Sequence, residues 1–511
     1  MSRNSSSSRR VRWWPAVLVL VLMLLAIGWA WLGSDFIRQM KVMFTVVVFI
    51  LGILLLLIWI TLFSRLRWKV RLATWGVLLV AVALFFGAFR YRGVTGDVVP
   101  VFEPRWKGET ATLTGEDLLT PTTFDYSQFL GSQRNGVVEG VKLTRDWSSR
   151  PPRLVWRRPV GLGWSSFAVV GDTAVTQEQQ GDEERIVCYD LKTADVRWSF
   201  GYQASYTSPL AGDGPRSTPT IVDGKVFAMG ATGQLHALEL ESGRSLWSRD
   251  VLEDNDASVP EWGKSCSPLV VDGLVVVSAG GSDGKSLVAY DRETGEIVWR
   301  AGDGGSSYAS PFVTILAGVR QIVMLNSRSV VGHDPEDGRV LWSHPSPSGQ
   351  PVVAQPLPIP GDRLLVSIGY GVGSKLYQIS ASSEDSLEAT LVWETPRMKS
   401  KFANLVLHGG FVYGLDDGIL ACLDPETGDL RWKRGRYGHG QLILVDDLLL
   451  LQTETGEIVL VEPTPEEHRE LTRFRVMDGK VWNSPALAGP HLLVRTEREA
   501  ALFELPLEAD E

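Results

Sequence analysis

The sequence predicts an all-β eight-bladed β-propeller with four-stranded blades, preceded by an N-terminal three-helix transmembrane anchor. Three observations lead to this fold class: three uncharged apolar runs near the N-terminus, a tryptophan-terminated motif that recurs along the rest of the chain, and one unpaired strand-like segment at each end of the repeats. Of the 511 residues, 1–92 contain 12 Lys or Arg and one acidic residue, whereas the remainder contains 38 basic and 58 acidic residues. The net charge of −9 is therefore the sum of a basic anchor and an acidic domain. The acidic balance disfavours a nucleic-acid partner.

The apolar runs occupy residues 13–32, 42–63 and 72–89, and none of them contains a charge. About 20 apolar residues suffice for a helix to cross the hydrocarbon core of a bilayer, so each run can span it. Buried core helices are the alternative, but such helices would show polar faces. The expected organisation is a cytoplasmic basic tail at 1–12, three transmembrane helices within 13–92, a linker at 93–124 and the propeller at 125–511.

The orientation of the anchor follows from its basic residues. Four arginines precede the first run and four basic residues fill the second loop, whereas the first loop contains only Arg38 and Lys41 beside Asp35. Basic loops stay on the cytoplasmic side. We therefore expect a multi-pass protein of the plasma (inner) membrane with a cytoplasmic N-terminus and a periplasmic or otherwise extracytoplasmic propeller.

An eleven-residue motif ends at Trp198, Trp247, Trp299, Trp342 and Trp432, with an Asp/Glu-x-x-Thr/Ser-Gly core in its clearest copies. Degenerate copies end at Trp393 and Phe474, and Trp156 lacks the first half of the motif. Successive ends lie 39 to 52 residues apart, which is the period of a four-stranded propeller blade. We expect the closing indoles to dock neighbouring blades; these residues are Trp156, Trp198, Trp247, Trp299, Trp342, Trp393 and Trp432.

A second unit precedes each motif: a small residue, often Ser-Pro, and then apolar residues that lead to an Asp-Gly turn, as in Ser217–Gly224. This pattern predicts the inner hairpin of a blade. Eight such hairpins start near Ser165, Ser217, Cys266, Ala309, Ala354, Ala403, Gly440 and Asn483. The unpaired strands around Trp156 and 502–507 are expected to share the last blade, which closes the ring. Seven blades would follow if one degenerate copy failed.

The motif Ala289–Trp299 resembles the docking motif of the quinoprotein-like (PQQ-like) β-propeller superfamily, and the resemblance extends from about Asp125 to the C-terminus. The lead-in 125–131 and the pair Trp262 and Gly263 also resemble that group. The superfamily includes quinone-dependent alcohol and sugar dehydrogenases. It also includes non-catalytic scaffolds similar to the propeller lipoprotein of the outer-membrane assembly machinery.

The resemblance implies specific equipment for a dehydrogenase: an adjacent cysteine pair, a Ca²⁺ held by Glu, Asn and Asp, and a catalytic Asp. The chain has three isolated cysteines, Cys188, Cys266 and Cys422, and no Cys-x-x-Cys-His haem motif. Its seven histidines show no metal-binding spacing. We therefore expect no catalytic residue, no metal and no cofactor; PQQ and Ca²⁺ enter only if the chain is a dehydrogenase.

The segment Ala279–Ser286 fits a relaxed phosphate-loop pattern. A phosphate loop requires a following helix, whereas Leu287–Asp291 begins a repeat strand, so we expect a hairpin turn and no nucleotide.

The residues that enter the inner strands are expected to crowd the mouth of the central channel. Aromatic faces and cations there suit a planar or anionic ligand, or an extended peptide. The alternative is that these side chains only plug the channel. The acidic loop 252–262 beside the mouth lacks Ca²⁺-loop spacing. The candidate binding residues are Trp164, Arg216, Trp262, Lys264, Tyr308, Lys401, Asn404, His439 and Trp482. Phe402, directly before Ala403, stands at the position equivalent to Trp164.

The leading functional hypothesis is a membrane-anchored, non-catalytic binding or scaffold module that contacts the lipid bilayer and a protein partner of the cell envelope. The alternative is a PQQ-dependent membrane dehydrogenase that oxidises an alcohol or sugar. A carbohydrate-binding propeller is a third hypothesis.

Overall fold

The computed structural model describes residues 11–108, 112–114, 124–346, 349–383 and 386–508. The chain divides into two compact units, Met1–Gly108 and Glu109–Glu511. Most of the expected cytoplasmic tail (1–10), and parts of the expected linker (109–111 and 115–123), lie outside the described residues.

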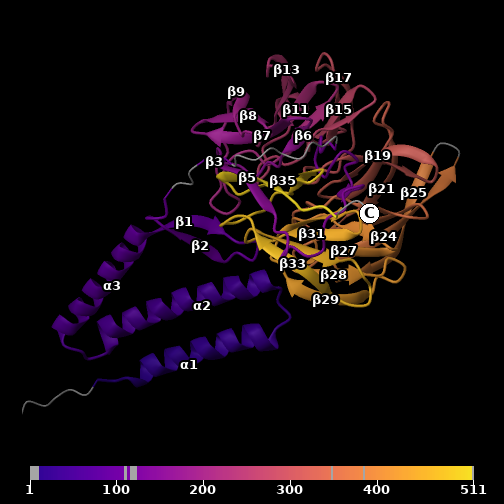
Figure 1. The fold of residues 1–511 in the computed structure, drawn as a ribbon. Helices are drawn as coiled ribbons and strands as arrows, with labels where there is room; N and C mark the ends of the chain where they lie inside the picture. Colours follow the sequence, from indigo (N-terminus) through magenta and orange to yellow (C-terminus); the bar gives the residue numbers. More distant parts are fainter. Residues whose placement is uncertain (1–10, 109–111, 115–123, 347–348, 384–385, 509–511) are drawn as a thin grey trace, which may run out of the picture. The chain divides into compact units, whose positions relative to one another are not determined.

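The first unit contains three helices that are long and apolar enough to cross a membrane (Figure 1). They are α1 (Trp14–Gly28), continued by the π-helical turn η1 (Trp29–Gly33); α2 (Arg38–Ile58), continued by η2 (Trp59–Phe63); and α3 (Trp68–Ala88). Two strands follow α3 and pair as an antiparallel hairpin: β1 (Phe89–Val94), most of which lies in the segment expected to hold the transmembrane helices (13–92), and β2 (Pro100–Pro104), which lies in the expected linker (93–124). An ion pair of 2.8 Å joins Arg38 at the start of α2 to Asp97 in the turn of this hairpin.

The second unit is an eight-bladed β-propeller with four-stranded blades, which confirms the predicted fold class. Blade 1 contains β6 (Ala168–Val170), β7 (Thr173–Gln180), β8 (Glu183–Asp190) and β9 (Val196–Gln203). Blade 2 contains β10 (Thr220–Val222), β11 (Lys225–Met229), β12 (Gln234–Glu239) and β13 (Ser245–Asp250), and the short helix η3 (Glu253–Asn255) follows it. Blade 3 contains β14 (Leu269–Val271), β15 (Leu274–Ser278), β16 (Leu287–Asp291) and β17 (Ile297–Ala301). Blade 4 contains β18 (Phe312–Leu316), β19 (Val319–Leu325), β20 (Ser329–His333) and β21 (Val340–Pro345).

The remaining blades complete the ring. Blade 5 contains β22 (Leu357–Ile359), β23 (Arg363–Ile368), β24 (Gly373–Ser383) and β25 (Ser386–Thr395). Blade 6 contains β26 (Val406–His408), β27 (Phe411–Asp416), β28 (Ile419–Leu423) and β29 (Leu430–Arg436). Blade 7 contains β30 (Gln441–Val445), β31 (Leu448–Gln452), β32 (Glu457–Glu462) and β33 (Arg469–Arg475). Blade 8 contains β34 (Ala486–Ala488), β35 (His491–Arg495), β36 (Glu499–Glu504) and, from the N-terminal side, β5 (Arg153–Pro159).

Blade 8 closes the ring as predicted, because β5 pairs antiparallel with β36 and places Trp156 opposite Leu502. In Figure 1 the early strand β5 lies among the yellow C-terminal strands. A further short strand, β3 (Leu113–Thr114), pairs with β5 and covers the outer edge of this blade. Closure leaves neither terminal strand of the repeat array unpaired.

The inner hairpins turn where the sequence predicts. Asp223 and Gly224 have φ values of 48° and 70°, and they join β10 to β11. Two successive positive φ values define the two-residue hairpin turn that Asp-Gly favours.

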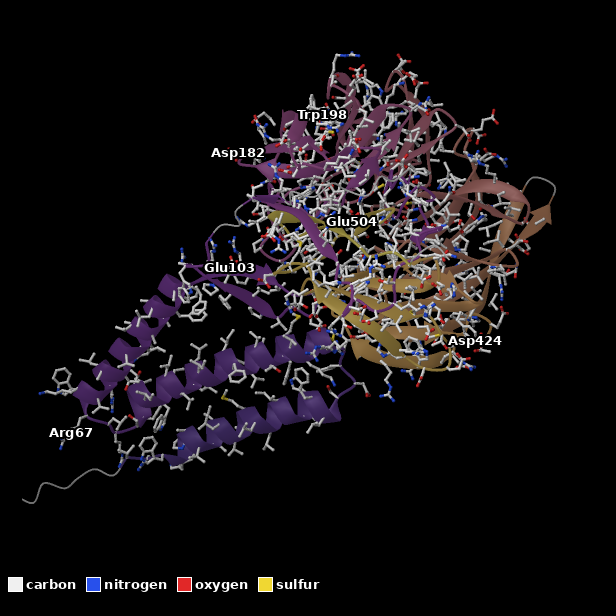
Figure 2. The ribbon with its side chains drawn as sticks, viewed as in Figure 1. Arg67, Glu103, Asp182, Trp198, Asp424 and Glu504 are labelled. Carbon is white, nitrogen blue, oxygen red and sulfur yellow. The ribbon has the colours of Figure 1, made fainter. Side chains whose placement is uncertain are left out.

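Six of the seven candidate docking indoles donate a hydrogen bond to a backbone carbonyl of the next blade. The bonds run from Trp156 to Leu191 (2.8 Å), Trp198 to Leu240 (2.7 Å), Trp247 to Arg292 (2.9 Å), Trp299 to Pro335 (3.2 Å), Trp393 to Pro425 (3.0 Å) and Trp432 to Thr464 (2.8 Å). Gly243 in the accepting turn has φ 69°, and a Cβ there would lie 2.6 Å from the ring of Trp198, which is labelled in Figure 2. Glycine therefore provides both the turn and the space for the indole.

Trp342 is the exception, since its indole donates to the side chain of Gln321 in its own blade. The next blade explains the difference. Elsewhere the accepting carbonyl lies in the turn that follows the third strand of a blade, whereas β24 and β25 of the next blade continue as one long hairpin.

The lead-in to the propeller pairs with the innermost strands of several blades. Tyr126 exchanges backbone hydrogen bonds with Val169 in blade 1, and the amide of Ile221 in blade 2 donates to Ser127. The strand β4 (Val137–Val138) pairs in parallel with β30 of blade 7. Since innermost strands surround the axis of a propeller, this segment occupies the centre of the ring near the Asp-Gly turns.

Candidate functional site

The candidate site lies where the innermost strands begin. Trp164, Arg216, Tyr308 and Trp482 all occur in loops that join the outermost strand of one blade to the innermost strand of the next. Innermost strands run in one direction around a propeller, so these loops gather on one face. We call the following residues of this face the mouth belt: Trp164, Tyr206, Arg216, Trp262, Tyr308, Tyr370, Lys401, Phe402, Lys480 and Trp482.

One half of the mouth belt is a row of stacked rings. The ring centroids of Trp164 and Trp482 are 5.2 Å apart, and those of Trp482 and Phe402 are 5.1 Å apart. The ammonium of Lys480 lies 3.7 Å from the centroid of Trp482 and 4.9 Å from that of Trp164. Lys401 places its ammonium 5.7 Å from Phe402, which extends the alternation of cations and aromatic faces.

The other half is built around tyrosines. The ammonium of Lys401 lies 4.5 Å from the centroid of the Tyr370 ring, and the guanidinium of Arg216 lies 4.7 Å from that of Tyr206. The hydroxyl of Tyr308 accepts a 3.2 Å hydrogen bond from the amide of Trp262. The residues of the belt come from six of the eight loops between blades and, for Tyr370, from a turn within blade 5.

Burial shifts the pKa values of titratable side chains in the mouth belt. Burial lowers the pKa of Lys480 to about 8, while Glu497 and Glu454 favour its charged form. Burial also lowers the pKa of Arg216, and it raises the pKa of Tyr308 to about 12. Cations held at a partly desolvated surface interact strongly with an incoming anion.

Three of the predicted mouth residues support the loops from below. Lys264 is fully buried and donates to the carbonyls of Ser278 (2.9 Å) and Ala279 (2.7 Å). The side chain of Asn404 accepts a 2.7 Å hydrogen bond from the amide of Gln355. His439 is buried and packs edge-on against Phe402, with ring centroids 5.8 Å apart.

Sequence reasoning missed Tyr206, Tyr370 and Lys480 as belt residues. Tyr370 lies in the turn between the second and third strands of blade 5, where no repeat position marked it. Lys480 lies only two residues before Trp482, and this proximity was the available signal. Glu454 was also missed; its carboxylate accepts from the indole of Trp482 (2.8 Å) and from the amide of His439 (3.1 Å).

The sequence lacks the adjacent cysteine pair that the resemblance implies for a quinone-dependent dehydrogenase. Among the residues that the structure describes, no three His, Cys, Asp or Glu side chains come together as metal ligands. The three cysteines are buried at separate places in the propeller, and burial raises the pKa of Cys188 and of Cys422 to about 12. In the acidic loop 252–262, Asp254 pairs with Arg249 and Asp256 with Lys285.

The phosphate-loop pattern at 279–286 leads directly into strand β16. No helix N-terminus follows it to hold a phosphate.

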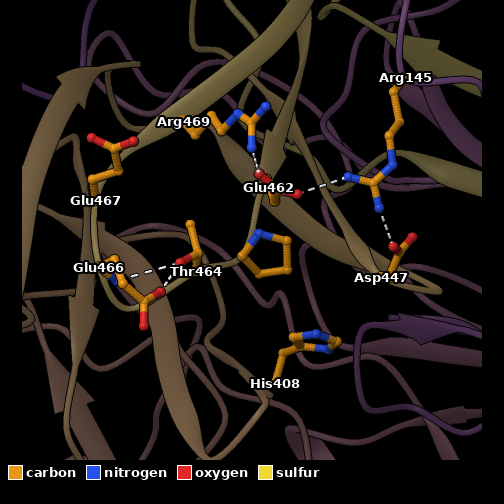
Figure 3. Close-up of a pocket in the computed structure, with 9 residues that line it drawn as sticks. Arg145, His408, Asp447, Glu462, Thr464, Glu466, Glu467 and Arg469 are labelled. Carbon is orange, nitrogen blue, oxygen red and sulfur yellow. Dashed lines mark hydrogen bonds and ion pairs between the residues drawn. The ribbon is translucent and has the colours of Figure 1, made fainter.

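A pocket of about 390 Å³ lies away from the predicted residues, between the turns of blades 6 and 7 and the lead-in (Figure 3). Glu462 accepts from Arg145 (2.9 Å) and Arg469 (2.7 Å), and Arg145 also pairs with Asp447. These ion pairs link four of the charged side chains, and His408, Glu466 and Glu467 line the same pocket.

The eight four-stranded blades and their recurring tryptophan motif define a propeller of the PQQ-like repeat class. The model of the family described as outer membrane protein assembly factor BamB matches residues 149–249 and 208–434, and the chain belongs to this family.

Curated relatives fall into two groups. BamB of Bordetella pertussis is 22% identical over 377 residues, which cover 70% of this chain and 87% of that protein; BamB of Burkholderia pseudomallei is 26% identical over 355 residues, which cover 67% and 85%. The quinoprotein alcohol dehydrogenase PedH of Pseudomonas putida is 26% identical over 148 residues, and the match spans only 24% of that enzyme.

Among solved structures, a europium-containing methanol dehydrogenase superposes with a TM-score of 0.57 at 14% identity, covering 75% of this chain and 98% of that one. Similarity at this level shows a shared fold.

Proposed function

We propose that the protein is a membrane-anchored, extracytoplasmic, non-catalytic binding or scaffold module of the cell envelope. The mouth belt is its binding surface for a protein partner. The observation that carries this proposal is the alternation of cations and aromatic faces on one face of the ring, beginning with Lys480 over the rings of Trp164 and Trp482.

The chemistry of the belt favours an extended peptide with aromatic and acidic side chains. Indole and phenol rings offer large contact areas with little loss of side-chain entropy, and cations over those rings attract carboxylates. The relatives named as outer membrane assembly factors, which match over most of their length, support an envelope protein as partner.

The proposed topology has the N-terminus in the cytoplasm and the propeller outside it, in the plasma (inner) membrane. The Arg38–Asp97 ion pair supports three antiparallel crossings, because these crossings bring the start of α2 and the end of α3 to one side. A protease added to intact spheroplasts should degrade the propeller while the N-terminal tail remains protected. Degradation of the propeller only after lysis would contradict this topology.

The partner can be captured at the mouth. A photo-crosslinking amino acid in place of Trp262 should join the protein to one defined envelope protein in living cells. The matched control carries the same amino acid in place of Ile315, which is 64% exposed on blade 4 and lies outside the belt. This control should give no crosslink to that protein.

Lys480→Gln together with Lys401→Gln should reduce that crosslink at least about tenfold, because residues at the centre of an interface contribute most to binding. An identical crosslink pattern at positions 262 and 315, or no effect of the lysine changes, would contradict binding at the mouth.

The alternative, a PQQ-dependent membrane dehydrogenase of an alcohol or sugar, draws support from the local similarity to quinoprotein alcohol dehydrogenases. That similarity covers 27% of this chain.

A further inference from the structure

The hairpin that follows α3 has two chemically different faces. In its register Tyr91 lies opposite Phe102, and Arg90 lies opposite Glu103. Directly opposed residues of an antiparallel pair share a face, and successive residues alternate between faces. One face is therefore aromatic and the other ionic.

The aromatic face continues the apolar surface of the last helix. Phe85 of α3 lies 5.2 Å from Phe89 and 5.0 Å from Phe102, measured between ring centroids. Phe89 in turn contacts Trp106 at 5.7 Å, and Trp106 is 71% exposed. Exposed aromatic side chains at the end of a membrane-spanning helix prefer the headgroup layer of the bilayer.

The ionic face carries more positive than negative charge. A single carboxylate, that of Glu103, faces Arg92 at 2.7 Å, Arg90 at 3.1 Å and Lys107 at 3.8 Å (Figure 2 labels Glu103). Arg105 adds a cation at the same end and donates to the carbonyl of Phe86 in α3. Guanidinium groups bind phosphate with charge-assisted hydrogen bonds, so this face is complementary to lipid phosphates.

We propose that the hairpin and the residues after it, 89–107, form an interfacial element that binds anionic phospholipid headgroups at the membrane surface where α3 ends. The aromatic face lies at the boundary between acyl chains and headgroups. Arg90, Arg92 and Lys107 contact lipid phosphates. The element thereby holds the end of α3 at a defined depth, independently of what the propeller binds.

A fluorophore placed beside the hairpin tests this proposal locally. Gly108→Cys adds a labelling site in open space, and the native cysteines are buried. The labelled full-length protein is reconstituted in phosphatidylcholine vesicles that contain headgroup-quencher phosphatidylglycerol or headgroup-quencher phosphatidylcholine. We expect both lipids to quench the label, with phosphatidylglycerol enriched over phosphatidylcholine.

Arg90→Gln, Arg92→Gln and Lys107→Gln in one variant should lower that enrichment at least about fivefold, because each cation near a membrane surface adds to its attraction for anionic lipid. Arg90→Lys with Arg92→Lys should retain it. The matched control combines Arg145→Gln, Arg320→Gln and Arg363→Gln on the propeller and should leave it unchanged. Three results would overturn the proposal. They are equal quenching by the two lipids in the unmodified hairpin, an unchanged enrichment in the glutamine variant, and a label that only aqueous iodide quenches.

Discussion

Replacing Arg134 with methionine should lower the free energy of unfolding by about 3 kcal/mol, because three backbone carbonyls lose their donors at once. Arg134 is 4% exposed, and its guanidinium joins the lead-in to two blades: it donates to the carbonyls of Pro311 (2.8 Å), Pro268 (3.1 Å) and Ser267 (2.5 Å). Burial lowers the pKa of Arg134 to about 10, so part of the loss is offset by relief of desolvation. Chemical denaturation of the detergent-solubilised full chain measures the change.

Arg150→Met is the matched control, because Arg150 is exposed and donates a single 3.2 Å hydrogen bond to Leu507. Its effect should stay within about 0.5 kcal/mol. Equal losses for the two variants would show that the Arg134 contacts between lead-in and blades contribute little.

Trp156→Ala should cost about 3–5 kcal/mol of unfolding free energy, the range for large buried aromatic side chains. Trp156 is 1% exposed, belongs to the strand that closes blade 8, and donates to Leu191 in blade 1. Its removal opens a cavity at the joint between the two ends of the repeat array.

Trp156→Phe separates packing from hydrogen bonding at the same position, and it should cost about 1 kcal/mol for the lost bond together with a smaller packing loss. Denaturation of both variants under the conditions used for Arg134→Met gives the comparison. A loss below 1 kcal/mol for the alanine variant would contradict the role of this indole in ring closure.

The repeats explain why so much of the fold could be predicted from the sequence. Asp223 and Gly224 favour a tight turn through their own backbone preferences. The pairing of the strand of Trp156 with that of Leu502 follows from counting the unmatched strands at the two ends of the repeats. Features that depend on a neighbour were not predictable. Trp342 bonds within its own blade because the outer strands of the blade beside it continue as a long hairpin where other blades turn, and Arg134 lies in a segment outside the repeats.

The candidate site was predictable where it follows the repeat and not elsewhere. Trp164, Arg216 and Trp482 precede equivalent inner strands, and they lie in the mouth belt. Lys264 occupies a similar position, yet its long side chain turns inward because the carbonyls of Ser278 and Ala279 accept its hydrogen bonds. Tyr370 reaches the mouth from a turn inside a blade, and its place depends on the tertiary arrangement of blades.

Quinone binding is the measurement that tests the central claim most directly. The purified full-length protein is titrated with PQQ in the presence of Ca²⁺, and dye reduction is then followed across a series of alcohols and aldoses. A non-catalytic binding module should show no saturable quinone binding and no substrate-dependent reduction, while the crosslink at position 262 persists. Saturable PQQ binding with turnover of an alcohol or sugar would contradict the account and establish the dehydrogenase.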